Sequence, residues 1–238
     1  MVIHTVRETG STNADLLSLA QSGVAEGYWL RAERQVAGRG RQGRHWASPI
    51  GNFYASTLVR VRRGDPPAAT LALLAAVALD EAIGIFLADH VAMALKWPND
   101  LLLAGAKLSG ILLERIDDAV VIGIGVNLAH HPDLPDRATT SLAARGVNVL
   151  PSTLGEVLAE SMVRWLTRWR GEGLAPVRAR WLARAHPPGT ALTARLPDGG
   201  SIEGLFDGLD ADGALLLRLA SGERRVIHAA DVFLLEGA

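Results

Sequence analysis

The stretch LKWPNDLLLAGAKLSGILLERIDDAVVIGIGVN, residues 95–127, decides the fold. Residues 107–115 and 119–126 are apolar runs of strand length, and the Asp117-Asp118 pair between them is typical of a tight turn. Residues 91–95 are a third predicted strand, which we expect a turn at Gly105 to join to 107–115. Strands joined by such short turns run antiparallel, so the stretch predicts antiparallel hairpins.

Helices and further strands are predicted on both sides of this stretch. A helix is expected to begin at Ser11 or Thr12 and to end at Gly23, because these are residue types that cap helices. Apolar periodicity predicts further helices over 66–87, 152–172 and 174–185, and strands over 28–34 and 52–61. The predicted class is therefore α+β, with a mixed, largely antiparallel sheet and packed helices.

The sequence HPPG, residues 186–189, is the clearest domain boundary in the chain. Two prolines cannot continue a helix, and the glycine frees the backbone that follows. Beyond it, short apolar runs alternate with the turn sequences PDGG, DADG and SGE, a spacing typical of a small all-β barrel. We expect one domain over residues 1–186 and a second over 187–238.

The composition restricts the classes of function. The chain has 238 residues and a formal net charge of -1, so no global field draws it to nucleic acid or to anionic lipid. It has no cysteine, which excludes disulfides, thiolate zinc sites and cysteine-based catalysis. The start resembles no signal peptide, and Asp80 and Glu81 interrupt the apolar run 68–88, which favours a buried helix over a membrane span. A cytoplasmic protein without a membrane partner is expected.

The loop AGRGRQGRHW, residues 37–46, contains the spacing G-x-G-x-x-G of dinucleotide-binding turns. A dinucleotide site needs a helix after the glycines, whereas Pro49 and Gly51 follow here, so this interpretation is not favoured. Between Arg34 and Gly64 there are seven arginines and no acidic residue. Arginines on a glycine-rich loop are suited to capture phosphate or carboxylate oxygens. The alternatives are a solvated basic loop or a nucleic-acid-binding arm, although aromatic residues are sparse for the latter.

Three further residue patterns carry functional hypotheses. Lys107 lies at the mouth of an apolar strand, where it is either a positioned charge or a lysine that reaches solvent. Gly123 and Gly125 interrupt the last apolar strand, as glycines do where a ligand or another backbone approaches closely. Asn127 follows them with a donor and an acceptor, which could read an adenine edge. The adjacent His130 and His131 are expected in a loop without a metal.

Six motifs occur in one order along the chain: STN (11–13), QVAGRGRQGRHW (35–46), SPIGNFY (48–54), KWPND (96–100), KLSGIL (107–112) and GIGVN (123–127). With this set the sequence resembles the biotin–protein ligases over nearly its whole length. The resemblance implies a catalytic domain similar to class II aminoacyl-tRNA synthetases and an SH3-like C-terminal barrel. It implies that ATP activates biotin to biotinyl-5′-AMP, with release of pyrophosphate, and that a lysine of a biotin carboxyl carrier domain then displaces AMP.

The resemblance also assigns the site residues. The catalytic residues implied are Lys107, Arg39 and Arg41. The biotin-binding residues implied are Ser11, Thr12, Asn13, Gln35, Gly38, Arg39, Lys107, Gly110 and Leu112. The adenylate-binding residues implied are Arg41, Arg44, Trp46, Asn127 and Lys107. Mg²⁺ is expected on the phosphates of ATP, with Asp100 as a candidate for organising the lysine or the metal, and no tightly bound prosthetic group is expected.

Ten residues precede STN, so the resemblance is to the ligase that lacks a DNA-binding domain, and no DNA partner is expected. A homodimer through a sheet edge remains an option. The alternative within the same fold is a lipoate–protein ligase, which uses the same adenylate chemistry, whereas a cysteine-dependent octanoyl transferase is excluded. The alternative from another class is a nucleic-acid-binding protein that uses the arginine loop but does not need Lys107.

Overall fold

The computed structural model describes residues 2–88 and 91–234. Seven strands form one sheet in the order β1-β2-β3-β7-β6-β5-β4. Of the strand pairs that the described residues form in this sheet, β1–β2 is parallel and the others are antiparallel, which confirms the predicted mixed, largely antiparallel sheet. The strands are β1 (Ile3–Thr9), β2 (Trp29–Gln35), β3 (Phe53–Arg60), β4 (Met93–Lys96), β5 (Asp100–Leu103), β6 (Ala106–Ile116) and β7 (Ala119–Val126).

Two strands were not predicted from the sequence. β5 follows the KWPND turn at once, so the turn at Gly105 joins β5 to β6, and the predicted hairpin between 91–95 and 107–115 is wrong. β1 lies at the edge of the sheet and is mostly exposed, and its sequence therefore lacks the apolar run of a buried strand. At the opposite edge, the backbone N–H of Leu95 donates to the carbonyl of Arg184 at 2.8 Å, which partly covers β4.

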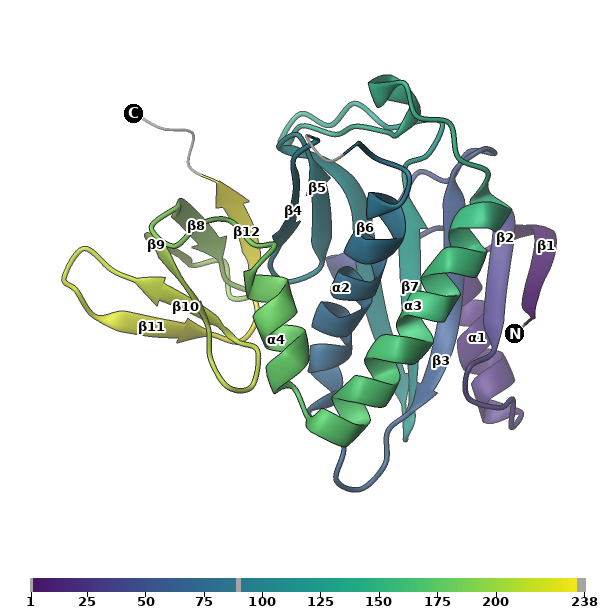
Figure 1. Ribbon diagram of the computed structural model, residues 1–238, viewed down its shortest axis with the longest axis horizontal. Helices are drawn as coiled ribbons and strands as arrows, with labels where there is room; N and C mark the ends of the chain where they lie inside the picture. The colour runs from purple at the N-terminus through teal and green to yellow at the C-terminus, as the bar shows by residue number, and fades with distance from the viewer. Residues whose placement is uncertain (1, 89–90, 235–238) are drawn as a thin grey trace.

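The helices cover the two faces of the sheet unequally (Figure 1). α2 (Leu71–Gly84), α3 (Pro151–Glu172) and α4 (Ala175–Leu182) pack on one face and bury the main core with alternate residues of β3 and β7. The short helix η2 (Ala68–Thr70) precedes α2. Among the described helices that pack on the sheet, α1 (Thr12–Gln21) alone lies on the other face, where it makes a small separate core with Leu58 and Val121. Much of that second face therefore remains open for a ligand.

The C-terminal segment forms a second, five-stranded sheet in the order β11-β10-β9-β8-β12. Its strands are β8 (Ala191–Arg195), β9 (Ser201–Leu209), β10 (Leu215–Arg218), β11 (Arg224–Ile227) and β12 (Asp231–Leu234), and all its pairs are antiparallel. Within residues 2–88 and 91–234 no ladder joins β11 to β12, so the predicted barrel is not closed. The carbonyl of Val232 on β12 instead accepts a hydrogen bond from Lys96 Nζ at 3.0 Å, which ties this strand to the larger sheet.

None of the helices in the described part of the chain is long and apolar enough to cross a membrane. α2 is the most apolar of them, but it has 14 residues and is almost wholly buried in the core. The expectation that the apolar run 68–88 is a buried helix is therefore confirmed.

Candidate active site

A cavity of about 430 Å³ opens on the α1 face of the sheet and is bounded at one end by β12. This volume is in the range of small-molecule sites in proteins. Every site residue predicted from the sequence lines the cavity except Gly38. The sequence motifs, which are spread over 117 residues from Ser11 to Asn127, therefore converge on one site.

One end of the cavity is polar but carries little charge. The backbone N–H and the hydroxyl of Thr12 both donate to Gln35 Oε1, at 2.8 and 3.1 Å. Ser56 was not predicted, and its buried hydroxyl lies 2.7 Å from Thr12 Oγ1 and 2.6 Å from Asn13 Oδ1. Because these side chains fix one another, the donors and acceptors at this end are pre-arranged for a neutral polar ligand.

Glycines on β6 and β7 make room for side chains that cross the sheet. A Cβ at Gly123 would overlap the amide of Asn13, and one at Gly125 would lie 2.7 Å from the indole of Trp46. Gly110 pairs with Gly125 across the two strands and contacts the same indole, with Lys107 Nζ 5.6 Å from the ring centre. The close approach that the glycines indicated is therefore made, in this structure, by Asn13 and Trp46.

A β-bulge aims Lys107 into the cavity. Leu101 of β5 pairs with Ser109, but Leu102 pairs with Lys107, so β6 has one extra residue at this point. Simple alternation along β6 would place Leu108 on the face of Gly110. In the structure Leu108 is fully buried in the main core, and Lys107 lines the cavity instead. Bulges of this kind redirect side chains next to functional sites.

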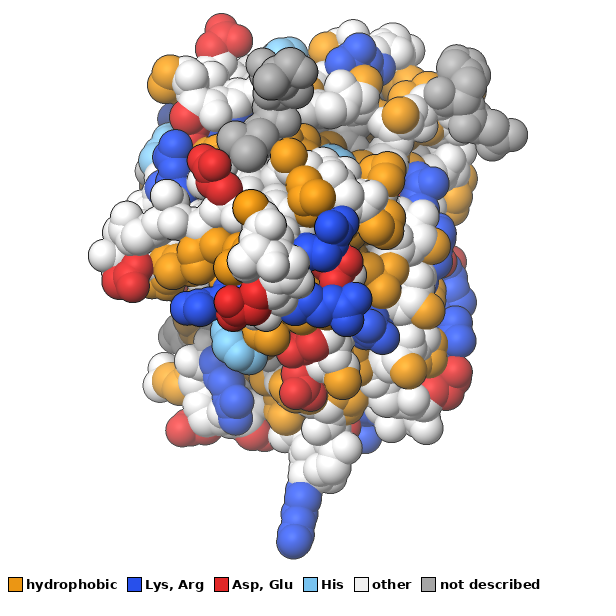
Figure 2. Space-filling view, turned by 90° about the vertical axis from the view of Figure 1, so that its left-hand side faces the viewer, with side chains coloured by type: hydrophobic (Ala, Val, Ile, Leu, Met, Phe, Trp, Pro, Cys, Tyr) orange, Lys and Arg blue, Asp and Glu red, His pale blue; other side chains and the backbone are white. Residues whose placement is uncertain are grey.

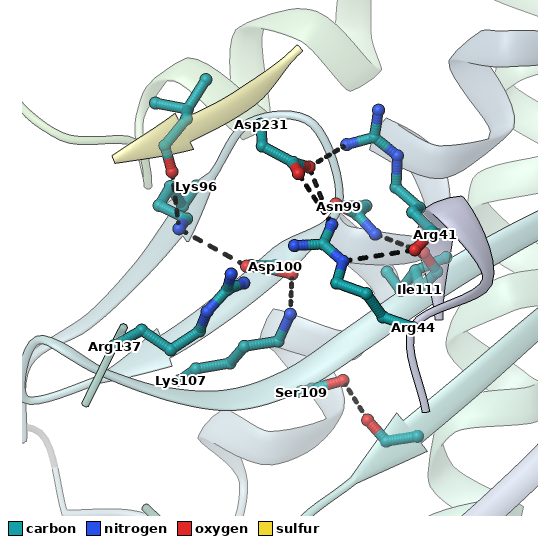
Figure 3. Close-up of polar contacts among 12 residues, drawn as sticks. Arg41, Arg44, Lys96, Asn99, Asp100, Lys107, Ser109, Ile111, Arg137 and Asp231 are labelled. Carbon is teal, nitrogen blue, oxygen red and sulfur yellow. Dashed lines mark hydrogen bonds and ion pairs between the residues drawn. The ribbon is translucent and has the colours of Figure 1, made fainter. Parts of the chain in front are cut away.

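Lys107 and Lys96 share one buried carboxylate, Asp100 (Figure 3). Lys107 Nζ lies 2.5 Å from Asp100 Oδ1, and Lys96 Nζ lies 3.5 Å from Oδ2. Burial by itself raises the pKa of Asp100, but the attraction of the two ammonium groups outweighs it and holds the pKa below its ordinary value. Burial lowers the pKa of Lys96, against the opposing attraction of Asp100.

Asp100 was predicted to organise either the lysine or the metal, and in the structure both of its oxygens face ammonium groups. A carboxylate held by two lysines is a poor ligand for Mg²⁺, which needs the same oxygen lone pairs. In the described ranges, no three His, Asp or Glu side chains come together in a way that could hold a metal ion. The residues present therefore do not make a protein-held magnesium site.

The arginine loop contacts the C-terminal sheet. Its turn η1 (Arg41–Gly43) places two arginines against Asp231 at the start of β12. Arg44 Nη2 lies 2.9 Å from a carboxylate oxygen of Asp231, and Arg41 Nη1 donates to the carbonyl of Ala230 at 3.0 Å and lies 3.4 Å from the same carboxylate. Arg39 is more exposed, with its guanidinium 3.8 Å from Glu114. The arginines thus border the cavity while an acidic residue of the second sheet holds two of them.

Two of the predicted site residues, Gly38 and Asn127, are held by contacts with other parts of the protein. Gly38 does not line the cavity, and a Cβ there would meet the carbonyl of Trp46 at 2.6 Å and Ser48 Oγ at 2.7 Å, so the loop itself requires this glycine. Asn127 is buried and lines the cavity, and its amide nitrogen donates to the carbonyl of Thr140 at 3.1 Å. The side-chain oxygen of Asn127 has no such partner in the described residues.

Several charged or aromatic lining residues were not assigned from the sequence, among them Lys96, Arg137, Asp231 and Phe233. Lys96 belongs to the KWPND motif, which indicated a turn but no role for its lysine. Asp231 and Phe233 lie more than 100 residues from the other lining residues in the first sheet, and only the docking of β12 brings them to the cavity. No pattern in the sequence indicates that contact.

Comparison with known proteins gives the family. The Biotin/lipoate A/B protein ligase family model matches residues 6–127, and the Biotin protein ligase C terminal domain matches residues 191–235. A biotin–[acetyl-CoA-carboxylase] ligase of Paracoccus denitrificans is 42% identical over 236 residues, which cover 94% of this chain and 97% of that protein. The chain belongs to the biotin protein ligase family. A ligase of the same name from Mycobacterium tuberculosis is 37% identical and covers 97% of this chain and 88% of its own.

Solved structures agree with this assignment. The biotin protein ligase of Aquifex aeolicus in complex with biotin and ATP superimposes with a TM-score of 0.86 over 98% of this chain and 99% of its own, at 24% identity, and so has the same fold. The biotin protein ligase of Leishmania major in complex with biotinyl-5-AMP is 27% identical, with a TM-score of 0.68 over 95% of this chain and 98% of its own. The resemblance noted in the sequence motifs is confirmed.

Proposed function

We infer that this chain is a biotin–protein ligase that uses ATP to activate biotin and then transfers biotin to a lysine of a carrier domain. The observation that carries this function is a single cavity that joins a neutral polar end to a cationic end. Thr12, Asn13 and Gln35 line the neutral end, and Lys107 and Lys96 line the cationic end. Biotin has a neutral ureido ring and an anionic carboxylate, so both of its ends find a matching environment here.

In the first step, a carboxylate oxygen of biotin forms a bond to the α-phosphorus of ATP. The bond from that phosphorus to the bridging oxygen breaks, and pyrophosphate leaves with the electron pair. Two anions must approach each other, so fixed positive charge lowers the barrier. Lys107 is suited to this role because the β-bulge aims it into the cavity and Asp100 fixes its ammonium group. Arg39 and Arg41 of the loop supply further charge at the rim.

In the second step, the neutral amine of an acceptor lysine attacks the acyl carbon of biotinyl-5′-AMP. An amide bond forms, the bond from the acyl carbon to the phosphate oxygen breaks, and AMP leaves with the electron pair of that bond, while the amine gives up one proton to solvent. The loop with Arg41 and Arg44 borders the cavity and can hold the adenylate until the acceptor arrives. Trp46 and Asn127 line the same space, in keeping with an adenine-binding role. A biotin carboxyl carrier domain is the acceptor that this chemistry implies.

The proposed function includes a metal ion, a cellular compartment and a candidate interface between two copies. Magnesium bound to the phosphates of ATP would neutralise part of their charge, and this chain would hold the complex through its lysines and arginines. The absence of cysteine suits a cytoplasmic enzyme. If two copies associate through a sheet edge, β1 is the edge to use, because backbone contacts at Leu95 cover part of β4.

A lipoate–protein ligase and a nucleic-acid-binding protein are less well supported. The relatives at 42% and 37% identity are biotin–[acetyl-CoA-carboxylase] ligases, which favours biotin as the acid. On the side of the molecule that the C-terminal sheet presents, basic and acidic side chains are intermixed (Figure 2). Two of the loop arginines contact Asp231, which reduces the charge that they offer to a nucleic acid.

Transfer of biotin to a purified biotin carboxyl carrier domain tests the proposed function, with the mass of the carrier as the readout. The wild-type chain should add one biotin per carrier in the presence of ATP and should add no lipoate or octanoate. Lys107→Met should abolish the transfer, and Arg145→Gln, a change of an exposed arginine that does not line the cavity, should leave it intact. Unimpaired transfer by Lys107→Met would refute the role of this lysine.

A further inference from the structure

Arg137 lies in the cavity next to Lys107, although it is part of no motif in the chain. The segment that follows it runs beside β6: the backbone N–H of Lys107 donates to the carbonyl of Ala138 at 2.9 Å, and that of Thr140 donates to the carbonyl of Lys107 at 3.0 Å. These bonds fix the position of Arg137 relative to Lys107. Arg137 lines the cavity, and Figure 3 shows its guanidinium beside Asp100, with Lys96 and Lys107 around the same carboxylate.

The charges at this end of the cavity do not balance. Lys96, Lys107 and Arg137 surround one buried carboxylate, that of Asp100. Two further carboxylates act on Arg137: Asp231, which already contacts Arg41 and Arg44, and Asp136, whose side chain is 46% exposed. Water screens the exposed carboxylate of Asp136, so Arg137 can exchange this partner for an anionic ligand in the cavity. The surplus of positive charge therefore predicts that an anion binds here.

Phe233 of β12 supports the guanidinium of Arg137. The Arg137 Cζ atom lies 5.5 Å from the centre of the Phe233 ring, and Lys96 Nζ lies 6.0 Å from the same ring. Cation–π contacts of this length favour a fixed placement of the cation. The aromatic ring thus limits how far Arg137 can swing into solvent, and its planar fork remains available for phosphate oxygens.

The geometry of the first step places the leaving pyrophosphate at the cationic end of the cavity. The strands β3, β7, β6, β5 and β4 follow one another across the sheet. The neutral polar end of the cavity lies over β3 and β7. The charged residues lie on the next three strands, with Lys107 on β6, Asp100 on β5 and Lys96 on β4. In phosphoryl and nucleotidyl transfer the attacking and leaving oxygens lie roughly in line through phosphorus. When biotin attacks from the side of β3 and β7, pyrophosphate must leave toward β5, β4 and β12, where Arg137 lies.

We propose that Arg137 binds the β- and γ-phosphates of ATP and the pyrophosphate that forms from them. This inference rests on the proposed ligase function and adds a positioning residue for the leaving group. It predicts a selective effect, because biotinyl-5′-AMP and AMP lack these two phosphates. Loss of Arg137 should weaken the binding of ATP and pyrophosphate without weakening the binding of the adenylate.

The test compares Arg137→Gln with Arg145→Gln in ATP–pyrophosphate exchange. One charged contact to phosphate predicts that Arg137→Gln raises the KM for ATP and the KM for pyrophosphate about tenfold or more. The KM for biotin and the Kd for biotinyl-5′-AMP, followed by tryptophan fluorescence, should change by less than about twofold. Arg145→Gln should match the wild type in all four constants.

Two results would overturn the inference. One is an unchanged KM for ATP in Arg137→Gln. The other is an equal loss of affinity for ATP and for biotinyl-5′-AMP, which would mean that Arg137 only supports the fold of its loop. Arg137→Lys keeps the charge and should recover part of the affinity for pyrophosphate, and no recovery would also count against a phosphate contact. Failure of the ligase function itself is distinguishable, because wild-type enzyme would then show no biotin-dependent exchange.

Discussion

Replacement of Asp100 should destabilise the protein more than replacement of the lysine that it contacts. Asp100→Asn keeps the shape of the side chain but removes the only carboxylate within 4 Å of Lys107 and Lys96 among the described residues. The side chains of these lysines are 15% and 13% exposed, so both ammonium groups would be left without a counter-ion and with little access to solvent. Removal of one partner of a buried ion pair typically costs about 3–5 kcal/mol.

Lys107→Met should cost far less. Asp100 keeps Lys96 Nζ at 3.5 Å as its counter-ion, and an apolar side chain of similar length replaces the lysine. We expect a loss of about 1 kcal/mol or less, since replacement of a paired charge by an apolar group can be nearly neutral when the other charge stays compensated. The structure therefore predicts that Asp100→Asn lowers the free energy of unfolding much more than Lys107→Met, although the two side chains contact each other at 2.5 Å.

Urea unfolding near neutral pH without ligand, followed by tryptophan fluorescence, measures both free energies of unfolding. The loss in Asp100→Asn should shrink as the pH rises toward about 10, because Lys96, whose pKa burial lowers, can then release its proton. Asp118→Asn is a matched control, as Asp118 pairs with Arg60 at the surface and is 55% exposed. If Lys107→Met destabilises the protein as much as Asp100→Asn, the two lysines do not share Asp100 in solution.

Three further predictions address the ligand-binding end, the loop and the acid stability. Gly123→Ala places a methyl group on the Asn13 amide and should raise the KM for biotin about tenfold, whereas Gly171→Ala, in open space on α3, should leave it unchanged; equal values would place biotin elsewhere. Arg41→Gly removes a charged contact and should speed the escape of biotinyl-5′-AMP about tenfold in a trapping assay, and unchanged retention would exclude a clamp at this residue. Arg170 holds the pKa of Glu26 below its ordinary value of 4.5, so the ion pair stabilises the fold above that pH and is lost as the pH falls through the lowered pKa. Glu26→Gln should therefore lower the free energy of unfolding at neutral pH and flatten its decline below pH 4.5. Urea titrations at several pH values measure this, and an equally steep decline in the wild type and the variant would contradict it.

The sequence predicted those parts of the fold that have strong local signals. Residues 119–126 match β7 because a strand buried on both faces needs a continuous apolar run. The helix over 152–172 matches α3, where apolar residues recur at helical spacing and Pro151 occupies the first turn. β1 escaped prediction because an exposed edge strand needs no such run. The barrel was predicted from turn spacing, which does not record that β12 pairs with β8 and contacts Lys96 rather than β11.

In the site, too, the sequence predicted the residues of local motifs but not the contacts between distant parts of the chain. Motifs carry the residues that line one face of a strand or loop, and Ser11, Gln35 and Asn127 indeed meet in one cavity. The face on which Lys107 lies depends on a one-residue bulge against β5, which alternation in β6 cannot reveal. Asp231 reaches the arginine loop only through the docking of two sheets. Contacts of this kind depend on tertiary packing, for which a single sequence has no periodic signal.

Biotin-dependent exchange of labelled pyrophosphate into ATP tests the central claim most directly, because it reports adenylate formation without any acceptor protein. The cavity predicts rapid exchange with biotin, none with lipoate or octanoate, and none with biotin in Lys107→Met. Exchange that does not depend on biotin, or that lipoate supports equally well, would contradict the account.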